Sequence, residues 1–161
     1  MSDSKSTSHL HIYLNDHLAG SVAALELLDH LIKHHEGKSL GIFFRDLGTE
    51  IRADQETLRN LIRELGAEES SVRKAGAWIA QKFGQMKIGA ADAEDSFGLL
   101  QALEVLALGI VGKKLLWRSL DAIVLHVPEL HGTDFRRLEM RAEEQIARVE
   151  AERLRTAREV F

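Results

Sequence analysis

Residues 40–65 read LGIFFRDLGTEIRADQETLRNLIREL, and their apolar side chains recur at alternating intervals of three and four. This spacing is that of one face of an α-helix, so it predicts a long amphipathic helix. One carboxylate, Asp54, falls on the apolar stripe. A carboxylate that points into a core is costly unless it meets a cation, a metal ion or several hydrogen-bond donors. We therefore expect a neighbouring helix to supply its partner.

The composition limits the classes of protein to which the chain can belong. It has 161 residues, 45% of them hydrophobic, with one proline, no cysteine and a net charge of -4. These values fit a single all-α domain, and the negative charge argues against nucleic acid as a partner. The lack of cysteine excludes disulfides and thiolate nucleophiles and suits a reducing compartment. No apolar run approaches the roughly 20 residues of a membrane span, so we expect a cytoplasmic protein that does not enter a membrane.

Helix starts and stops divide the chain into four long helices. They are expected from His9 or His11 to His35, from Leu40 to Leu65, from near Asp92 to before Pro128, and from Thr133 or Asp134 to the C-terminus. Gly37 and Gly66 follow the first two helices as left-handed stops. A shorter helix is expected over residues 68–88, between the second and third. Residues 1–8 are expected to form a disordered tail and residues 9–161 a single domain.

Connection lengths predict how these helices are arranged. Short connections after the first and third helices and a long one after the second predict an up-down-down-up four-helix bundle, as in ferritin-like folds. The third helix is apolar on two faces, one with Leu103 and Ile110 and the other with Leu100 and Val111. A helix of this kind must be covered twice. We expect one face in the core and the other against the crossover helix or a second subunit, which favours a homodimer.

Other polar side chains are expected beside Asp54. Lys113 of the third helix and Arg141 and Gln145 of the fourth fall within about one turn of its level. We expect a cation from Arg141 or Lys113 to neutralise Asp54, with Gln145 hydrogen-bonded in the same buried network. This interpretation requires no cofactor.

Alternatively, the partner of the Asp54 carboxylate is a metal ion, and the expected cofactor is then iron. The candidate ligands are His17, Glu50, Asp54 and Glu144. A di-iron site in such a bundle uses a Glu from each of two helices and Glu-x-x-His from each of the other two. The chain contains no Glu-x-x-His, so the residues favour the protein cation over the metal.

Two sequence phrases point to a family. The second helix carries Glu50 and Asp54 and is followed by Leu-Gly and then by paired serines, and the last helix contains RAEEQIARVE at residues 141–150. Together these phrases resemble the bacterial ferritin-like family of stress-associated YciF-type proteins. The resemblance implies a helical, dimeric protein, and some members are considered metal-binding. In this chain Ser21 or Ala24 stands where the family has a carboxylate on the first helix.

These observations favour a non-enzymatic helical bundle with a stress-related or scaffold role, and a divergent metal-binding protein is the alternative. No Ser-His-acid set is apparent, which argues against nucleophilic catalysis. Gly109 and Gly112 do not form a phosphate-binding loop, because no strand precedes them. The residues therefore favour a protein without catalytic activity over an enzyme.

Overall fold

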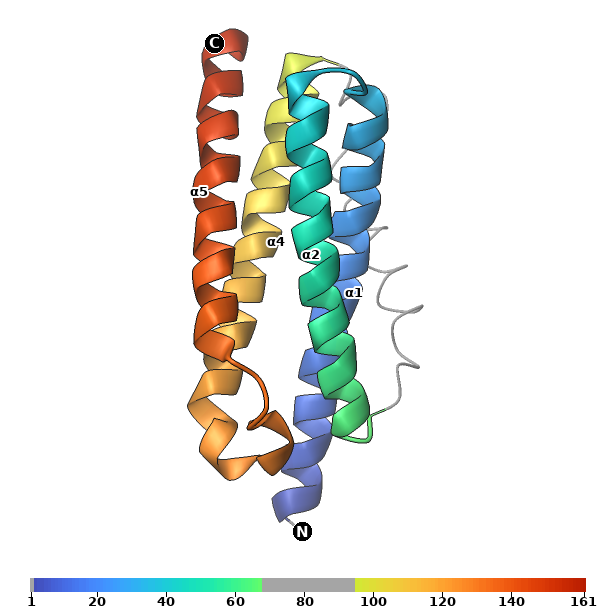
Figure 1. Ribbon diagram of the computed structural model, residues 1–161, viewed down its shortest axis with the longest axis vertical. Coiled ribbons are helices and arrows are strands. Elements are labelled where there is room, and N and C mark those ends of the chain that lie inside the picture. Colours follow the sequence, from blue (N-terminus) through green and yellow to red (C-terminus); the bar gives the residue numbers. More distant parts are fainter. Residues whose placement is uncertain (1, 68–94) are drawn as a thin grey trace.

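Four long helices make up most of the described chain (Figure 1). The computed structural model describes residues 2–67 and 95–161, and its long helices are α1 (Ser2–His34), α2 (Ser39–Glu64), α4 (Ser96–Ile123) and α5 (Phe135–Val160). Two short 3-10 helices, η3 (Val124–His126) and η4 (Pro128–Leu130), lie between α4 and α5. No strand occurs in the described residues, which confirms the prediction of an all-α protein. In the same residues, no helix combines the length and apolar character that crossing a membrane requires.

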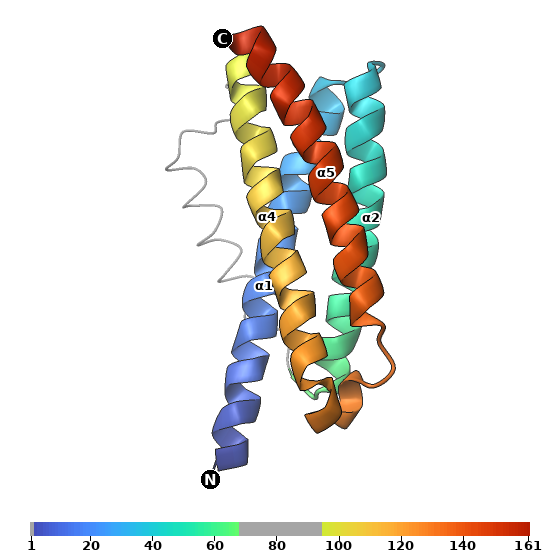
Figure 2. The ribbon, with the colours of Figure 1, turned by 90° about the vertical axis from the view of Figure 1, so that its left-hand side faces the viewer.

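The four helices lie side by side, two in each direction (Figures 1 and 2). α1 and α5 run upward in Figure 1, whereas α2 and α4 run downward. α1 packs mainly against α2 and α4 mainly against α5, while α1 also contacts α4. α2 and α5 approach each other closely at few points. The bundle therefore consists of two helical hairpins that meet along α1 and α4.

The first helix is longer than the sequence predicts. α1 begins at Ser2, so the structure describes residues 2–8 as helical where the sequence predicts a disordered tail over residues 1–8. Elongating an existing helix adds one hydrogen bond per residue without a new nucleation step, so polar residues can extend it. The helix stops agree with the prediction, because Gly37 has a φ of 76° and Gly66 a φ of 68°. Glycine adopts this left-handed conformation without steric cost.

Each helix of the hairpin formed by α4 and α5 begins with an aspartate N-cap. The sequence predicts a start near Asp92, which lies outside the described residues, as does the crossover helix expected over residues 68–88. α4 instead begins at Ser96, and the carboxylate of its N-cap, Asp95, accepts a hydrogen bond of 2.7 Å from the backbone N–H of Gly98. This bond satisfies one of the free N–H groups at the helix start.

The last helix, α5, is capped in the same way as α4. Asp134 is the N-cap of α5, and its carboxylate accepts a hydrogen bond of 3.0 Å from the backbone N–H of Arg137. The sequence predicts a start at Thr133 or Asp134, so the helix begins where its capping residue indicates. Phe135, the first residue of α5, is buried and fixes this end of the helix in the core.

Buried apolar side chains form two clusters along the bundle. One cluster lies towards the corner between α1 and α2 and includes Phe44 and Leu106. The other lies towards η3 and η4 and includes Leu58 and Trp117. Between the two clusters, all four helices contribute polar side chains, which are Ser21, Asp54, Gln55, Lys113 and Gln145. We call this set, together with Glu50, Arg141 and Arg148, the polar layer.

The corner between α1 and α2 depends on Gly41. A Cβ atom at Gly41 would collide with the backbone carbonyl oxygen of His35. The backbone N–H of Gly41 also donates to the carbonyl oxygen of Lys38 over 3.0 Å, which fixes the backbone here. The buried ring of His35 packs against Phe44, with ring centroids 5.8 Å apart. Only glycine therefore fits at the start of α2.

Replacing Gly41 with alanine should destabilise the protein by about 1–3 kcal/mol, because the added methyl group overpacks a fixed backbone. Gly20 is the matched control, since it lies inside α1 and a Cβ there would meet no described atom within 4 Å. Gly20→Ala should stabilise the protein by about 0.5–1 kcal/mol through helix propensity. Urea denaturation measures both changes, and equal stabilities of the two variants would contradict the role of Gly41.

Candidate functional site

Asp54 is a buried carboxylate between the two hydrophobic clusters. It lies on α2 between Ile51 and Leu58, which are also buried, and it is only 2% exposed. The apolar stripe of α2 therefore faces the core with the carboxylate on it. Taking such a charge out of water costs several kcal/mol unless charged or hydrogen-bonding partners compensate.

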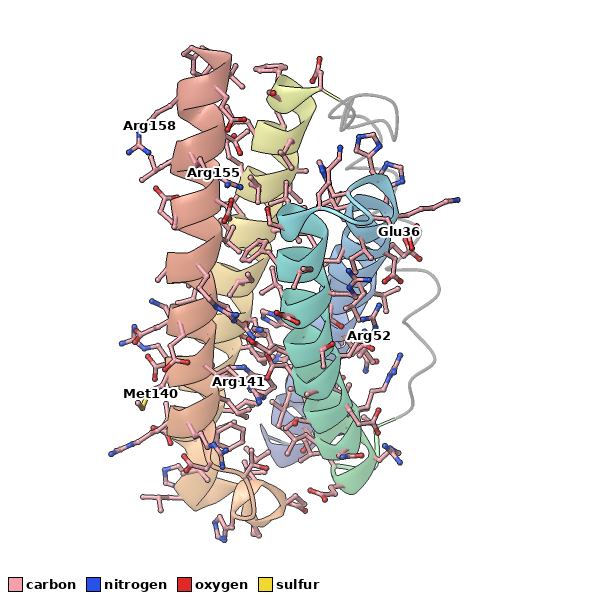
Figure 3. The ribbon with its side chains drawn as sticks, turned by 45° about the horizontal axis from the view of Figure 1, so that its top comes forward. Glu36, Arg52, Met140, Arg141, Arg155 and Arg158 are labelled. Carbon is pink, nitrogen blue, oxygen red and sulfur yellow. The ribbon has the colours of Figure 1, made fainter. Side chains whose placement is uncertain are left out.

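Two cations from two different helices contact Asp54. Lys113 on α4 donates from Nζ to Oδ2 of Asp54 over 2.5 Å, and Arg141 on α5 donates to Oδ1. The Lys113 side chain is 14% exposed and that of Arg141 33%, so both leave most of their water shell. Figure 3 shows Arg141 pointing towards α2, whereas its neighbour Met140 points away from the bundle. The sequence left the choice between the two cations open, and the structure brings both to the carboxylate.

Gln145 connects this ion cluster to a second carboxylate. Its Oε1 accepts a hydrogen bond from Lys113, and its Nε2 donates to Glu50 over 3.0 Å and lies 3.5 Å from Oδ2 of Asp54. Gln145 is fully buried, so the network supplies partners for both ends of its amide. Arg148, also on α5, donates to Glu50 over 2.5 Å. A continuous series of hydrogen bonds therefore runs from Lys113 inside the bundle to Arg148 at its surface.

Gln55 and Arg148 belong to the polar layer but are not among the predicted site residues. Gln55 is buried and donates to the hydroxyl of Ser21 on α1 over 2.8 Å. Its place four residues after Ile51, on the buried face of α2, was the available signal. Arg148 gave no such signal, because glutamates four residues before and after it suggest a solvated face. Its partner is instead Glu50 on another helix.

The polar layer shifts the proton affinity of two members. Burial lowers the pKa of Lys113, and Asp54 opposes part of this effect. Burial alone would raise the pKa of Glu50, but hydrogen bonds from Gln145 and Arg148 outweigh it and hold the pKa below its ordinary value. Glu50 therefore stays ionised at lower pH than a glutamate in water.

The four residues of the alternative metal site do not all come together, although Glu50 and Asp54 share the polar layer through Gln145. Glu50 lies in the polar layer, but Glu144 is exposed, and His17 packs edge-on against Tyr13 with ring centroids 4.7 Å apart. Burial lowers the pKa of His17, and Asp16 opposes the shift. In the described part of the chain, no group of three or more histidine, aspartate or glutamate side chains could hold a metal ion.

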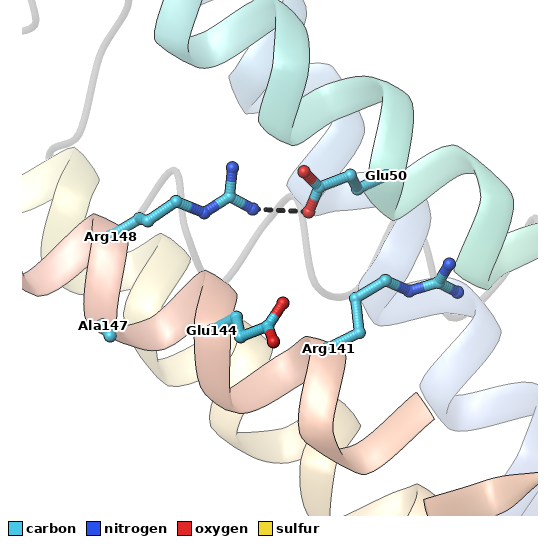
Figure 4. A pocket seen from close by; sticks show the side chains of 5 residues that line it. All are labelled: Glu50, Arg141, Glu144, Ala147 and Arg148. Carbon is cyan, nitrogen blue, oxygen red and sulfur yellow. Dashed lines mark hydrogen bonds and ion pairs between the residues drawn. The ribbon is translucent and has the colours of Figure 1, made fainter. Parts of the chain in front are cut away.

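A groove lies between α2 and α5 beside the polar layer (Figure 4). Its volume is about 680 Å³, and its lining residues are Glu50, Arg141, Glu144, Ala147 and Arg148. The ion pair between Glu50 and Arg148 crosses the groove from one helix to the other. Two carboxylates and two guanidinium groups line it, so their formal charges cancel.

Removing one partner of the buried ion cluster should destabilise the protein more than removing matched partners together. Lys113→Met should cost about 3–5 kcal/mol, because it leaves Asp54 undercompensated in the core. Arg141→Met should also be strongly destabilising, whereas Asp54→Asn together with Arg141→Met should be milder than the sum of the single losses. Chemical denaturation of the single and double variants measures this coupling.

An exposed ion pair provides the control for this cycle. Arg136 on α5 lies 3.6 Å from Asp121 on α4, and its side chain is 84% exposed, so Arg136→Met should cost no more than about 1 kcal/mol. Strictly additive losses at Asp54 and Arg141 would show that these residues do not act as a unit.

The pH dependence of stability should report the lowered pKa of Glu50. A carboxyl group whose pKa is lower in the folded state stabilises the protein above the ordinary value of about 4.5, and this stabilisation disappears as the pH falls through the lowered value. The difference in unfolding free energy between wild type and Glu50→Gln should therefore shrink as the pH falls below about 4.5. Urea titrations at a series of pH values measure it. Arg148→Met should remove part of the same pH dependence, and a difference that grows on acidification would contradict the assignment.

Comparisons with known proteins assign no family to the chain. No protein-family model matches it, and neither does any curated protein or solved structure. Conclusions about function therefore depend on the residues and geometry of the polar layer.

Proposed function

We propose that this protein is a non-enzymatic, ferritin-like helical bundle with a stress-related or scaffold role. In this proposal the polar layer takes the position that a di-metal site has in other ferritin-like proteins. The helix directions in Figure 1, two up and two down, support a bundle of this topology. The resemblance of the second and last helices to the YciF-type family motivates the stress-related role.

One observation carries the proposal. Both oxygens of the buried carboxylate of Asp54 have protein cations as partners, Lys113 on one and Arg141 on the other. A divalent cation at this carboxylate would have to displace or repel two positive charges within a few ångströms, in a medium that screens them poorly. The carboxylate therefore serves the protein's own cations in preference to a metal.

The remaining ligand chemistry also supports this interpretation. A di-metal carboxylate site needs inward-facing carboxylates and imidazoles from all four helices. At this level α1 contributes the hydroxyl of Ser21 and α5 the amide of Gln145, both engaged in hydrogen bonds to protein groups. Neutral oxygen donors of this kind hold iron weakly compared with carboxylates and imidazoles.

One feature favours the alternative, a divergent iron-binding protein. Glu50 and Glu144 line the same groove from opposite helices, with Glu144 on the exposed side. A weak site for one ion could use these two carboxylates at the surface, away from Asp54. Glu50 already has Arg148 as its partner, which reduces its affinity for a metal ion.

Metal analysis of untagged protein separates the two proposals. We expect far less than one iron per chain by elemental analysis and no faster oxidation of added iron(II) than in buffer, because the carboxylates are neutralised by protein cations. Glu139→Ala on α5 is the matched control for Glu50→Ala, since Glu139 pairs with the exposed Arg118. Stoichiometric iron that disappears in Glu50→Ala and persists in Glu139→Ala would overturn the proposal in favour of metal binding.

A further inference from the structure

The outer face of α4 carries a second apolar stripe that the core does not use. Leu108, Val111 and Leu115 follow at intervals of three and four residues and are 70%, 36% and 51% exposed. The core-facing side of the same helix is separate and includes the buried Leu103 and Ile110. Contiguous exposed apolar side chains on one helix face usually mark an interaction surface. We call Leu108, Val111 and Leu115 the α4 outer stripe.

The surface beside the α4 outer stripe is open enough for another helix to approach. Gly112 lies one turn after Leu108, at the edge of the stripe, and a Cβ atom there would meet no described atom within 4 Å. Small residues next to apolar ones allow two helix backbones to come close together. A facing helix would therefore contact both the leucine side chains and the backbone of α4.

Charges at the two ends of the stripe indicate which partner fits. Glu104 lies seven residues before Val111, and Arg118 lies seven residues after it, on the same face of the helix. Their side chains are 52% and 60% exposed, although each has a partner on α5. Leu108 and Leu115 lie three residues before and four residues after the same centre. The apolar residues of this face are therefore nearly symmetric about Val111. The charges at its two ends are of opposite sign, with Glu104 at one end and Arg118 at the other.

A face with this pattern is complementary to a second copy of itself. In an antiparallel pair centred on Val111, Glu104 lies at the level of the partner's Arg118, and Leu108 lies within one residue of the level of the partner's Leu115. A parallel pair would instead bring Glu104 to the partner's Glu104 and Arg118 to the partner's Arg118, and like charges repel. A twofold axis perpendicular to the helix satisfies the isologous symmetry of homodimers.

We propose that α4 pairs with α4 of a second copy of this chain, in antiparallel orientation, about a twofold axis at Val111. The dimer uses Leu108, Val111 and Leu115 as its apolar centre and Glu104 with the partner's Arg118 as its flanking ion pairs. This interface lies on the opposite side of α4 from the polar layer. It is therefore independent of the function proposed for that layer.

The first test is the mass of the protein in solution, from sedimentation equilibrium over a concentration series. The chain of 18.0 kDa should sediment as a dimer. Leu108→Glu combined with Leu115→Glu should weaken dimerisation by about 100-fold or more, because four carboxylates would be buried per dimer. Ile42→Glu is the matched control, since Ile42 is an apolar side chain of α2 with 56% exposure, and it should leave the dimer intact. A monomer at all concentrations, or a dimer indifferent to the double change, would overturn the proposal.

The second test exchanges the charges. Glu104→Arg alone and Arg118→Glu alone should each weaken dimerisation by about ten-fold, and the two together should restore it. Within one chain the exchange cannot restore anything, because Glu104→Arg would face Arg153 and Arg118→Glu would face Glu139. Recovery of the dimer in the double variant therefore reports contacts between subunits, and a double variant weaker than either single one would contradict them.

The third test determines the orientation of the two helices. The chain has no cysteine, so single cysteines introduce unique crosslinking sites. Val111→Cys should form a disulfide between subunits under mild oxidation, because it lies on the twofold axis. Glu104→Cys and Arg118→Cys should crosslink when mixed but not separately. Crosslinking of each variant with itself would indicate a parallel pair and overturn the proposed geometry.

Discussion

A carboxylate cannot remain charged inside a protein without partners, and this constraint organises the middle of the bundle. Lys113 of α4 and Arg141 of α5 both donate hydrogen bonds to Asp54 on α2. α2 and α5 make few close backbone contacts, and the ion pairs of Arg141 with Asp54 and of Arg148 with Glu50 connect them. The ion cluster therefore sets the level at which one helical hairpin faces the other.

The hydrophobic clusters on either side of the polar layer have a different role. Apolar side chains can exchange packing partners with modest changes in energy. The ion pairs and hydrogen bonds of a buried polar cluster form in one arrangement of the helices only. Gln145 extends this specificity, because each end of its amide has a defined partner in the layer. The clusters bury apolar area, whereas the hydrogen bonds of the polar layer require the four helices to meet at one level. We therefore regard the layer as an element of specificity more than of net stability.

α4 is the helix in which core and surface meet. One side carries Lys113 and the buried residues of both clusters, while the other carries the α4 outer stripe. The two sides have different requirements. The inner side must supply a cation to Asp54, and the apolar side chains of the outer side must be covered to keep them from water. An antiparallel pair of α4 helices would cover the outer side without changing the inner one. The same helix can therefore hold the polar layer and form a subunit interface.

Much of this architecture was determined by the sequence alone. Helical periodicity is local, so residues 40–65 predicted α2 and the burial of Asp54, and the glycine stops at Gly37 and Gly66 were correct. The extension of α1 over residues 2–8 was not predicted, because polar residues at a helix end carry no periodic signal.

The partners of Asp54 were decided only by the tertiary structure. Lys113 and Lys114 are adjacent in sequence, yet Lys113 reaches Asp54 while Lys114 lies 3.7 Å from Glu143 on α5. Arg148 likewise bonds to Glu50 on α2 and not to the glutamates four residues away on its own helix. Adjacent residues on a helix point about 100° apart, so these choices depend on the rotation and level of each helix. Both are set by packing between distant segments, which no local pattern in the sequence encodes.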